Sequence, residues 1–160
     1  MTIVEDRIRA AKQQIEQAFA GVEYPRGKAV VSDADGKDLV LSFTDKHWRD
    51  IAVETLTYSS LYFFTKEGFQ FFLPAFLLGA LDEANGELRT RLVRALAPRE
   101  PGDPAQEAAF QERIGLCTPS QRAAIRDFLA VVAERYADDF TRKPPALAAD
   151  GFWLRGDAAQ

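Results

Sequence analysis

The fold is decided by residues 64–81, which read FTKEGFQFFLPAFLLGAL. Thr65 is suited to cap a helix, because its hydroxyl can accept a hydrogen bond from a free amide of the first turn. The residues that follow are apolar almost all round a helix, which is typical of a segment buried on every side. Pro74 lies too deep for the first turn, so it should remove one backbone hydrogen bond and kink the helix. We therefore expect a proline-kinked central helix with the core built around it.

Amphipathic helices are predicted on both sides of this segment. Near the start, Thr2 and Glu5 form a capping-box pair, and apolar residues then recur at three- and four-residue spacing. Further along, Thr118 as cap, Pro119 in the first turn and Gln121 three residues after the cap predict another helix start. The remaining apolar patterns predict helices within residues 44–55, 88–96 and 110–114.

Residues 29–43 fit two different structures. Val30 and Val31 precede a turn rich in Asp and Gly, and the alternating apolar residues after that turn suit a β-hairpin. The spacing of Leu39 and Phe43 also suits a short helix, because it brings both side chains to one face. We prefer the helix, with the hairpin as the alternative.

Together these patterns predict a mainly α protein, an irregular bundle of five or six helices with at most one small β-hairpin. A chain of 160 residues lies within the usual size of one domain. We place a single helical domain at residues 1–143, because the helical pattern decays after Tyr136. Residues 144–160, with their repeated Pro, Ala, Asp and Gly, are expected to form a loosely packed tail.

Composition excludes several classes of protein. Twenty Lys and Arg against twenty-four Asp and Glu leave a formal charge of -4, which repels phosphate backbones and argues against nucleic acid as a partner. The most apolar stretch contains Gln70 and Pro74 and is shorter than the ~18 apolar residues of a membrane span, so no membrane association is expected. Cys117 is the single cysteine, which rules out an intramolecular disulfide and favours the cytoplasm.

His47, Asp50 and Glu54 are the best candidates for chemistry. Their spacing of three and four residues would stack them on one helix face, where they could form a general base with carboxylate support or part of a metal site. A catalytic metal normally needs about three protein ligands, and this chain has a single histidine. A solvated helix face is the simpler interpretation, so we predict no metal and no cofactor.

Aromatic and basic residues are the better candidates for binding. Aromatic side chains crowd into residues 58–76 in greater number than one helix face can bury, so some could border a partner surface instead of the core. A basic concentration follows, which could bind an anion or an acidic partner. The candidate binding residues are Trp48, Tyr58, Tyr62, Phe69, Arg89, Arg91 and Arg94.

The segment from Phe64 to Leu78 resembles an uncharacterised bacterial family, a domain of unknown function with a similar Thr-x-Glu, aromatic, Leu-Pro-Ala-Phe-Leu run. The resemblance extends back through Phe43, Trp48 and Ile51, and forward to the stretch that holds Leu116, Thr118, Pro119, Gln121, Ile125 and Phe128. It implies a short helix leading to Phe43, which is why we prefer the helix there. It supplies no catalytic residues. Members often place a Cys or an acidic cluster at residues 32–38, and because this chain has no cysteine there, no metal role is carried over.

We therefore expect a non-catalytic protein-interaction module of immunity-like or regulatory type, whose partner is another protein. The main support is the poverty of catalytic motifs. The alternative is a small hydrolase or metal-assisted enzyme that uses the face of His47, Asp50 and Glu54. The sequence gives neither the oligomeric state nor the identity of any partner or substrate.

Overall fold

The structure is a computed structural model that describes residues 2–32, 37–59, 61–148 and 153. Within these ranges the chain forms seven α-helices, four short 3-10 helices and no β-sheet, so the mainly α fold is confirmed. Five α-helices have ten or more residues, and α2 and α3 are shorter. The elements are α1 (Ile3–Phe19), α2 (Lys37–Phe43), η1 (Trp48–Asp50), α3 (Val53–Tyr58), η2 (Leu61–Phe63), α4 (Lys66–Ala80), α5 (Gly86–Ala95), α6 (Pro104–Arg113), α7 (Pro119–Arg135), η3 (Ala137–Asp139) and η4 (Pro145–Leu147).

Helix α4 is the centre of the molecule, as the sequence predicts. The Thr65 hydroxyl accepts a hydrogen bond from the Gly68 amide at 3.1 Å and so caps the helix. All four phenylalanines of α4 are buried, and α4 packs against α1, α3, α5 and α6. The helix continues on both sides of Pro74 and has 15 residues. No helix in the described part of the chain has the length and apolar content that crossing a membrane requires.

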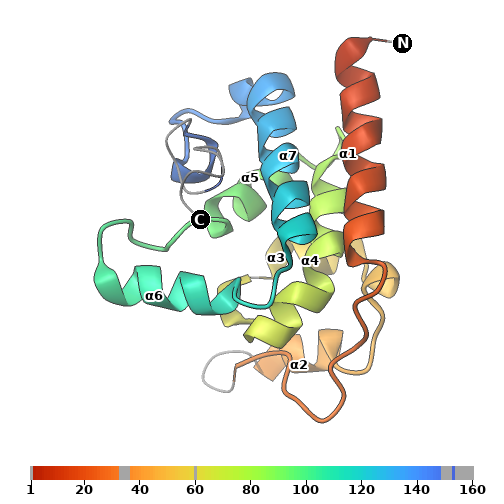
Figure 1. Cartoon of the computed structure of the whole chain (residues 1–160), viewed down its shortest axis with the longest axis vertical. Helices are drawn as coiled ribbons and strands as arrows, with labels where there is room; N and C mark the ends of the chain where they lie inside the picture. The colour runs from red at the N-terminus through yellow and green to blue at the C-terminus, as the bar shows by residue number, and fades with distance from the viewer. Residues whose placement is uncertain (1, 33–36, 60, 149–152, 154–160) are drawn as a thin grey trace.

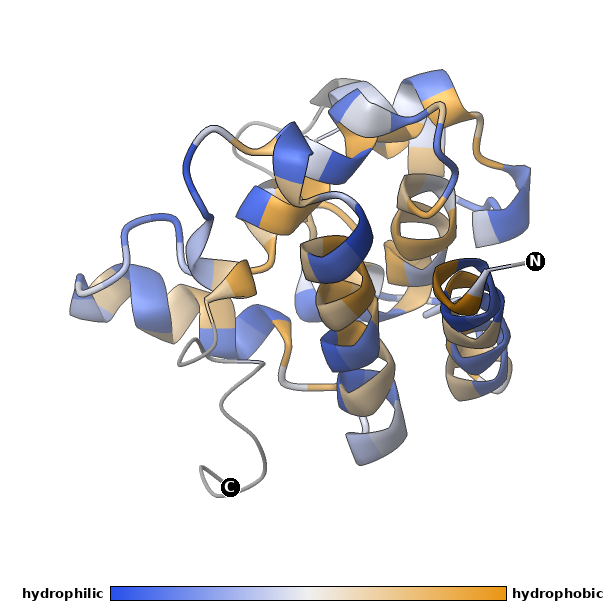
Figure 2. Cartoon of the chain, turned by 90° about the horizontal axis from the view of Figure 1, so that it is seen from above, coloured by the Kyte–Doolittle hydropathy of each residue, from blue (hydrophilic) through white to orange (hydrophobic). Residues whose placement is uncertain are grey.

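Helices α1 and α7 lie side by side, and α1 also packs on α4 (Figure 1). Both begin with the predicted capping box, in which Thr2 pairs with Glu5 and Thr118 with Gln121. Coloured by hydropathy and seen from above, the helices turn their apolar stripes toward one another and their polar residues outward (Figure 2). The core is therefore continuous from α1 across α4 to α5 and α7.

The segment before α4 forms a short helix and not a hairpin among the described residues. Helix α2 ends at Phe43, and Val31 instead pairs antiparallel with Phe64 in an isolated bridge. A Cβ atom at Gly68 would lie 2.0 Å from the Val30 carbonyl oxygen, so this close approach requires glycine. Residues 33–36, where the hairpin turn was expected, lie outside the described residues.

The start of the predicted tail belongs to the core. Ala146 and Leu147 of η4 are buried. Trp153 is buried too, and its indole Nε1 donates a 2.7 Å hydrogen bond to the Leu96 carbonyl. The expectation of loose packing is therefore wrong for these residues, because their apolar side chains cover the ends of α5 and α7. Residues 149–152 and 154–160 lie outside the described residues.

Candidate functional site, an arginine and tyrosine pocket

A small pocket opens between α3, η2 and α5. Its volume is about 210 Å³. Buried side chains of α3, η2, α4 and α5 form its apolar floor, and exposed or half-buried tyrosines and arginines form its rim. The floor consists of Leu56, Leu61, Phe76, Leu88, Leu92 and Ala95, and the rim of Tyr58, Ser59, Tyr62, Arg91 and Arg94. Four of the seven predicted binding residues thus meet at one pocket.

The helical period of α5 places the two rim arginines. Leu88 and Leu92 are one turn apart and buried, so they fix which face of α5 meets the core. Arg91 follows Leu88 by three residues and borders this buried stripe, Arg94 lies further round the helix, and both are exposed. Arg91 pairs with Glu87 across one turn, Nη2 to Oε1, at 3.2 Å. Because both side chains are about half exposed, this pair stabilises the helix by only about 0.3–0.5 kcal/mol.

The two tyrosines of the rim differ in exposure. Tyr58 is 70% exposed, although the Arg91 guanidinium carbon lies 5.5 Å from its ring centroid. Tyr62 is half-buried, and its hydroxyl donates a 3.1 Å hydrogen bond to the Arg94 carbonyl. This bond ties η2 to α5 across the pocket and holds its shape. Tyr58 is thus the side chain that a partner could cover.

Two further arginines bring positive charge to Tyr62. The guanidinium carbons of Arg99 and Arg113 lie 5.0 and 5.4 Å from its ring centroid, and Arg113 Nη2 also donates to the Tyr62 carbonyl. Such cation–π contacts are typically worth about 0.5–1 kcal/mol when exposed. No residue in the described ranges forms an ion pair with Arg94, Arg99 or Arg113. The pocket is therefore locally basic on a chain whose net charge is -4.

Burial and charge perturb the groups beside the pocket. Burial lowers the pKa of Arg113, and the nearby positive charge of Arg99 lowers it further, against the opposing influence of Tyr62 and Glu112. Burial raises the pKa of Tyr62, and the two arginines partly offset that rise. Within the described chain, Arg113 Nε is a buried donor with no hydrogen-bond partner. An unpaired buried donor costs stability, which is unusual in a purely structural arginine.

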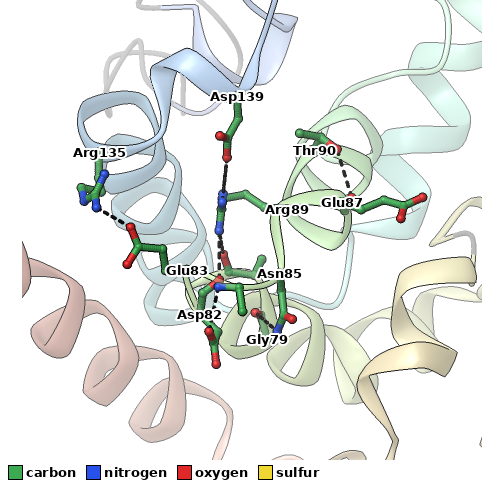
Figure 3. A network of polar contacts seen from close by, with 11 residues as sticks. Gly79, Asp82, Glu83, Asn85, Glu87, Arg89, Thr90, Arg135 and Asp139 are labelled. Atoms are coloured by element: carbon green, nitrogen blue, oxygen red, sulfur yellow. Dashed lines mark hydrogen bonds and ion pairs between the residues drawn. The ribbon is translucent and has the colours of Figure 1, made fainter.

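Arg89 has a different place from the other predicted basic residues. It is 2% exposed, and its guanidinium donates to Asp139 Oδ2 at 2.7 and 2.8 Å and to the Ala80 and Asp82 carbonyls at 3.0 and 3.1 Å (Figure 3). It also lies 3.6 Å from the ring centroid of Tyr136. The expectation that Arg89 belongs to a binding surface is therefore wrong, because every direction around it is taken by the protein itself.

Two predicted aromatic residues also belong to the core. Phe69 is fully buried on α4, and Trp48 is 5% exposed. Arg49 covers the remaining edge of Trp48, with its guanidinium carbon 4.3 Å from the ring centroid. Since neither side chain reaches the surface, the exposed patch predicted from the aromatic crowding is reduced to Tyr58 with part of Tyr62.

The predicted face of His47, Asp50 and Glu54 does not form. Instead of one helix, the chain makes η1, extended backbone at Ile51 and Ala52, and then α3. His47 Nδ1 accepts a 3.0 Å hydrogen bond from the Arg49 amide and caps η1. In the neutral imidazole the proton is therefore on Nε2.

The three residues also do not share a cavity. His47 borders an open cavity of about 840 Å³ together with Asp45 and Glu23, whereas Asp50 and Glu54 do not line it. In the part of the chain that the structure describes, no group of three or more His, Cys, Asp or Glu side chains is placed to hold a metal ion. The geometry gives these residues no common chemistry.

Cys117 is a core thiol. Burial raises its pKa to about 11, and the charge of Arg122 opposes that rise only partly. Since the thiolate is the nucleophile, a thiol with this pKa is almost wholly protonated at neutral pH. The arrangement therefore favours packing over nucleophilic catalysis.

Sequence reasoning missed Arg113 as a neighbour of the pocket. It is the last residue of α6 and meets Tyr62 across 51 residues of chain, so no local spacing could reveal the contact. Arg99 stands at the edge of the basic concentration in the sequence, but only the fold brings it to Tyr62. The missed residues are thus both long-range contributors of positive charge.

Comparison with known proteins identifies the chain at the level of a family. Residues 9–155 match the family of unknown function DUF6714, which covers nearly the whole chain. The chain belongs to this family. The match includes α2 to α7 entire and extends beyond Trp153, so the DUF6714 region and the packed core nearly coincide. No curated protein and no solved structure matches the chain.

Proposed function

We propose that this DUF6714 protein is a non-catalytic protein-interaction module that binds another protein through the arginine and tyrosine pocket. The observation that carries the proposal is Tyr58, a large aromatic side chain that is 70% exposed beside a formed apolar pocket. Tyr and Arg are the residue types enriched at the energetic centres of protein interfaces. These two types make up the rim of this pocket together with Ser59.

The character of the pocket supports a macromolecular partner. Small-molecule sites usually have volumes of about 300–1,000 Å³ and convergent polar groups inside. This pocket is smaller, at about 210 Å³, and its polar groups stand on the rim. A partner surface that covers Tyr58 and inserts one group into the pocket fits this form better than a cofactor does.

The proposed setting is the cytoplasm of a bacterium. A single buried cysteine suits a reducing compartment, and the sequence resembles bacterial family members. The immunity-like or regulatory role belongs to the same proposal, because such proteins act by covering a partner surface and need no catalytic group. The oligomeric state is left to measurement.

Affinity capture from a lysate of the source cells tests the proposal. Three purified proteins are compared: the wild type, a Tyr58→Ala, Arg91→Ala variant, and a His47→Ala, Glu54→Ala variant. We expect a stoichiometric partner that the wild type and the His47 variant retain and the Tyr58 variant loses. Each altered side chain is exposed, so the variants should stay folded, which circular dichroism verifies.

The same experiment tests the enzyme alternative. If no partner is retained, and a metal or small molecule co-purifies with the wild type but not with the His47→Ala, Glu54→Ala variant, the interaction proposal fails. A partner that all three proteins retain in equal amount would place the interface elsewhere on the molecule. Either result contradicts the role proposed for the pocket.

A further inference from the structure

The pocket has the size and floor of a receptor for one apolar side chain. Its floor is built from aliphatic and aromatic groups of four elements, and Leu56, Leu61 and Leu88 are each at most 3% exposed. With a volume of about 210 Å³, it holds one large side chain and no folded element. Burying such a side chain supplies the apolar part of a binding free energy.

The surroundings of the pocket select a negative partner. Arg91 and Arg94 stand on the rim. Arg99 and Arg113 lie close to the ring of Tyr62. One contact among the described residues offsets this charge directly, the exposed pair of Arg91 with Glu87. Guanidinium groups without carboxylate partners bind carboxylates through charge-assisted hydrogen bonds, often in bidentate form. The surplus positive charge is therefore complementary to Asp and Glu side chains.

The geometry points to a specific occupant: a short acidic segment of a partner protein that inserts one apolar side chain between Tyr58 and Tyr62 while its flanking carboxylates bind Arg91 and Arg94. This inference rests on the proposed function and adds the chemistry of the partner. The charge of -4 on the whole chain disfavours a nucleic acid, which carries a phosphate charge at every nucleotide, more than a short segment with a few carboxylates. The apolar floor likewise distinguishes the site from a simple anion site.

Selection from a library of short random peptides displayed on phage tests the occupant directly. The wild-type protein is the bait. Peptides that also bind an Arg91→Ala, Arg94→Ala variant are discarded, because they bind outside the pocket. An Arg26→Ala, Arg142→Ala variant serves as the matched control, since it loses the same two charges from exposed positions outside the pocket. Thermal unfolding of all three proteins verifies that they remain folded.

We expect selected peptides to carry Asp and Glu around a single Leu, Ile, Met or Phe. Fluorescence anisotropy with one selected peptide should show affinity reduced about tenfold or more by Arg91→Ala, Arg94→Ala and unchanged in the control variant. Replacing the apolar residue of that peptide by Ala should reduce affinity to a similar extent. Added salt should weaken binding, because the rim contacts are exposed.

Several results would overturn the inference. The selected peptides could show no enrichment of Asp and Glu, or acidic peptides could bind equally well after their apolar residue is replaced by Ala. The inference also fails if no peptide remains after the counter-selection. Peptides that match a segment of this chain, together with self-association in sedimentation, would assign the pocket to a second copy instead. A lysate partner that needs Tyr58 but lacks an acidic segment would leave the proposed function standing while this inference fails.

Discussion

Helix α5 presents two faces that carry the same residue type for opposite purposes. On its inner face, Arg89 is buried and its guanidinium donates to Asp139 and to the Ala80 and Asp82 carbonyls. On its outer face, Arg91 and Arg94 are exposed, and only Arg91 has an ion-pair partner in the described chain. The inner arginine joins α5 to the end of α4 and to η3 (Figure 3). The outer two border the pocket.

The difference shows that the surroundings of an arginine, and not its presence, decide its role. A fully buried guanidinium needs a charged partner, because an unpaired buried charge costs several kcal/mol. Once paired to Asp139 and two carbonyls, Arg89 has nothing left for a ligand. The exposed arginines contribute little to folding and keep their donors available. The two faces therefore separate stability from binding.

The largest expected effect comes from Arg89→Ala. The substitution leaves Asp139 and the Ala80 and Asp82 carbonyls without their donor, and it removes the contact with the Tyr136 ring. We expect the free energy of unfolding to fall by about 3–5 kcal/mol. Urea denaturation followed by circular dichroism measures it. A loss comparable to that of Arg91→Ala would break the contrast between the two faces.

A second effect of burial is expected at Cys117, and it depends on pH. In the unfolded chain the thiol ionises at its ordinary pKa of 9.0, whereas the folded thiol has a pKa of about 11. Between these values the unfolded state binds fewer protons, so the thiol lowers folding stability as pH rises. From pH 8 to 10.5 the loss should reach about 2 kcal/mol.

Denaturation of the wild type and of Cys117→Ala at both pH values isolates this loss, because the other groups titrate equally in the two proteins. The difference in stability between them should shift in favour of Cys117→Ala at the higher pH. A difference that stays constant would mean that the thiol is ionised as readily in the folded as in the unfolded chain. Burial of a charged group in the core would then cost less than the full pairing of Arg89 suggests.

A smaller effect is expected from Asp139→Asn, which keeps the shape of the side chain and removes its charge. The carboxylate is 32% exposed, so solvent screens part of its attraction to Arg89. We expect a loss of about 1 kcal/mol in the free energy of unfolding. The Arg89→Ala, Asp139→Asn double variant completes a mutant cycle, and strictly additive losses would show that the pair is not coupled.

The smallest effect on stability is expected from Arg91→Ala and Arg94→Ala. Both side chains are exposed, and the one ion pair they make is weak, so each change should stay within about 0.5 kcal/mol of the wild type. Scanning calorimetry of the two variants checks this. A large loss of stability in either variant would mean that the exposed arginines, like Arg89, stabilise the fold, and it would weaken the binding proposal.

Much of the fold follows from local signals in the sequence. The caps at Thr65 and Thr118 and the all-round apolar pattern of α4 give the correct helices because hydroxyl capping and burial act over a few residues. The helical period also contains a signal that our interpretation of α5 passed over. Arg89 precedes the buried Val93 by four residues and the buried Leu96 by seven, so its place on the buried face was readable from spacing alone.

The candidate site is less accessible to sequence reasoning. The spacing of His47, Asp50 and Glu54 predicts a single helix. Instead the chain forms η1, which packs against α4 and buries Trp48, and then α3. No Gly or Pro in the sequence marks the break between them. The meeting of Tyr62 with Arg99 and Arg113 likewise depends on tertiary packing. Composition could therefore indicate which residue types line the pocket, but not which individual residues do.

The position of Trp153 affects how this protein folds during its synthesis on the ribosome. Its hydrogen bond to the Leu96 carbonyl spans 57 residues, and its ring lies edge-on to Phe110 at 6.2 Å between centroids. A domain folds as a unit, and its N-terminal part leaves the ribosome first. The region around Leu96 and Phe110 cannot be sealed until the tryptophan has left the exit tunnel, so a nascent chain stalled before that point keeps an unfinished core exposed to chaperones and proteases.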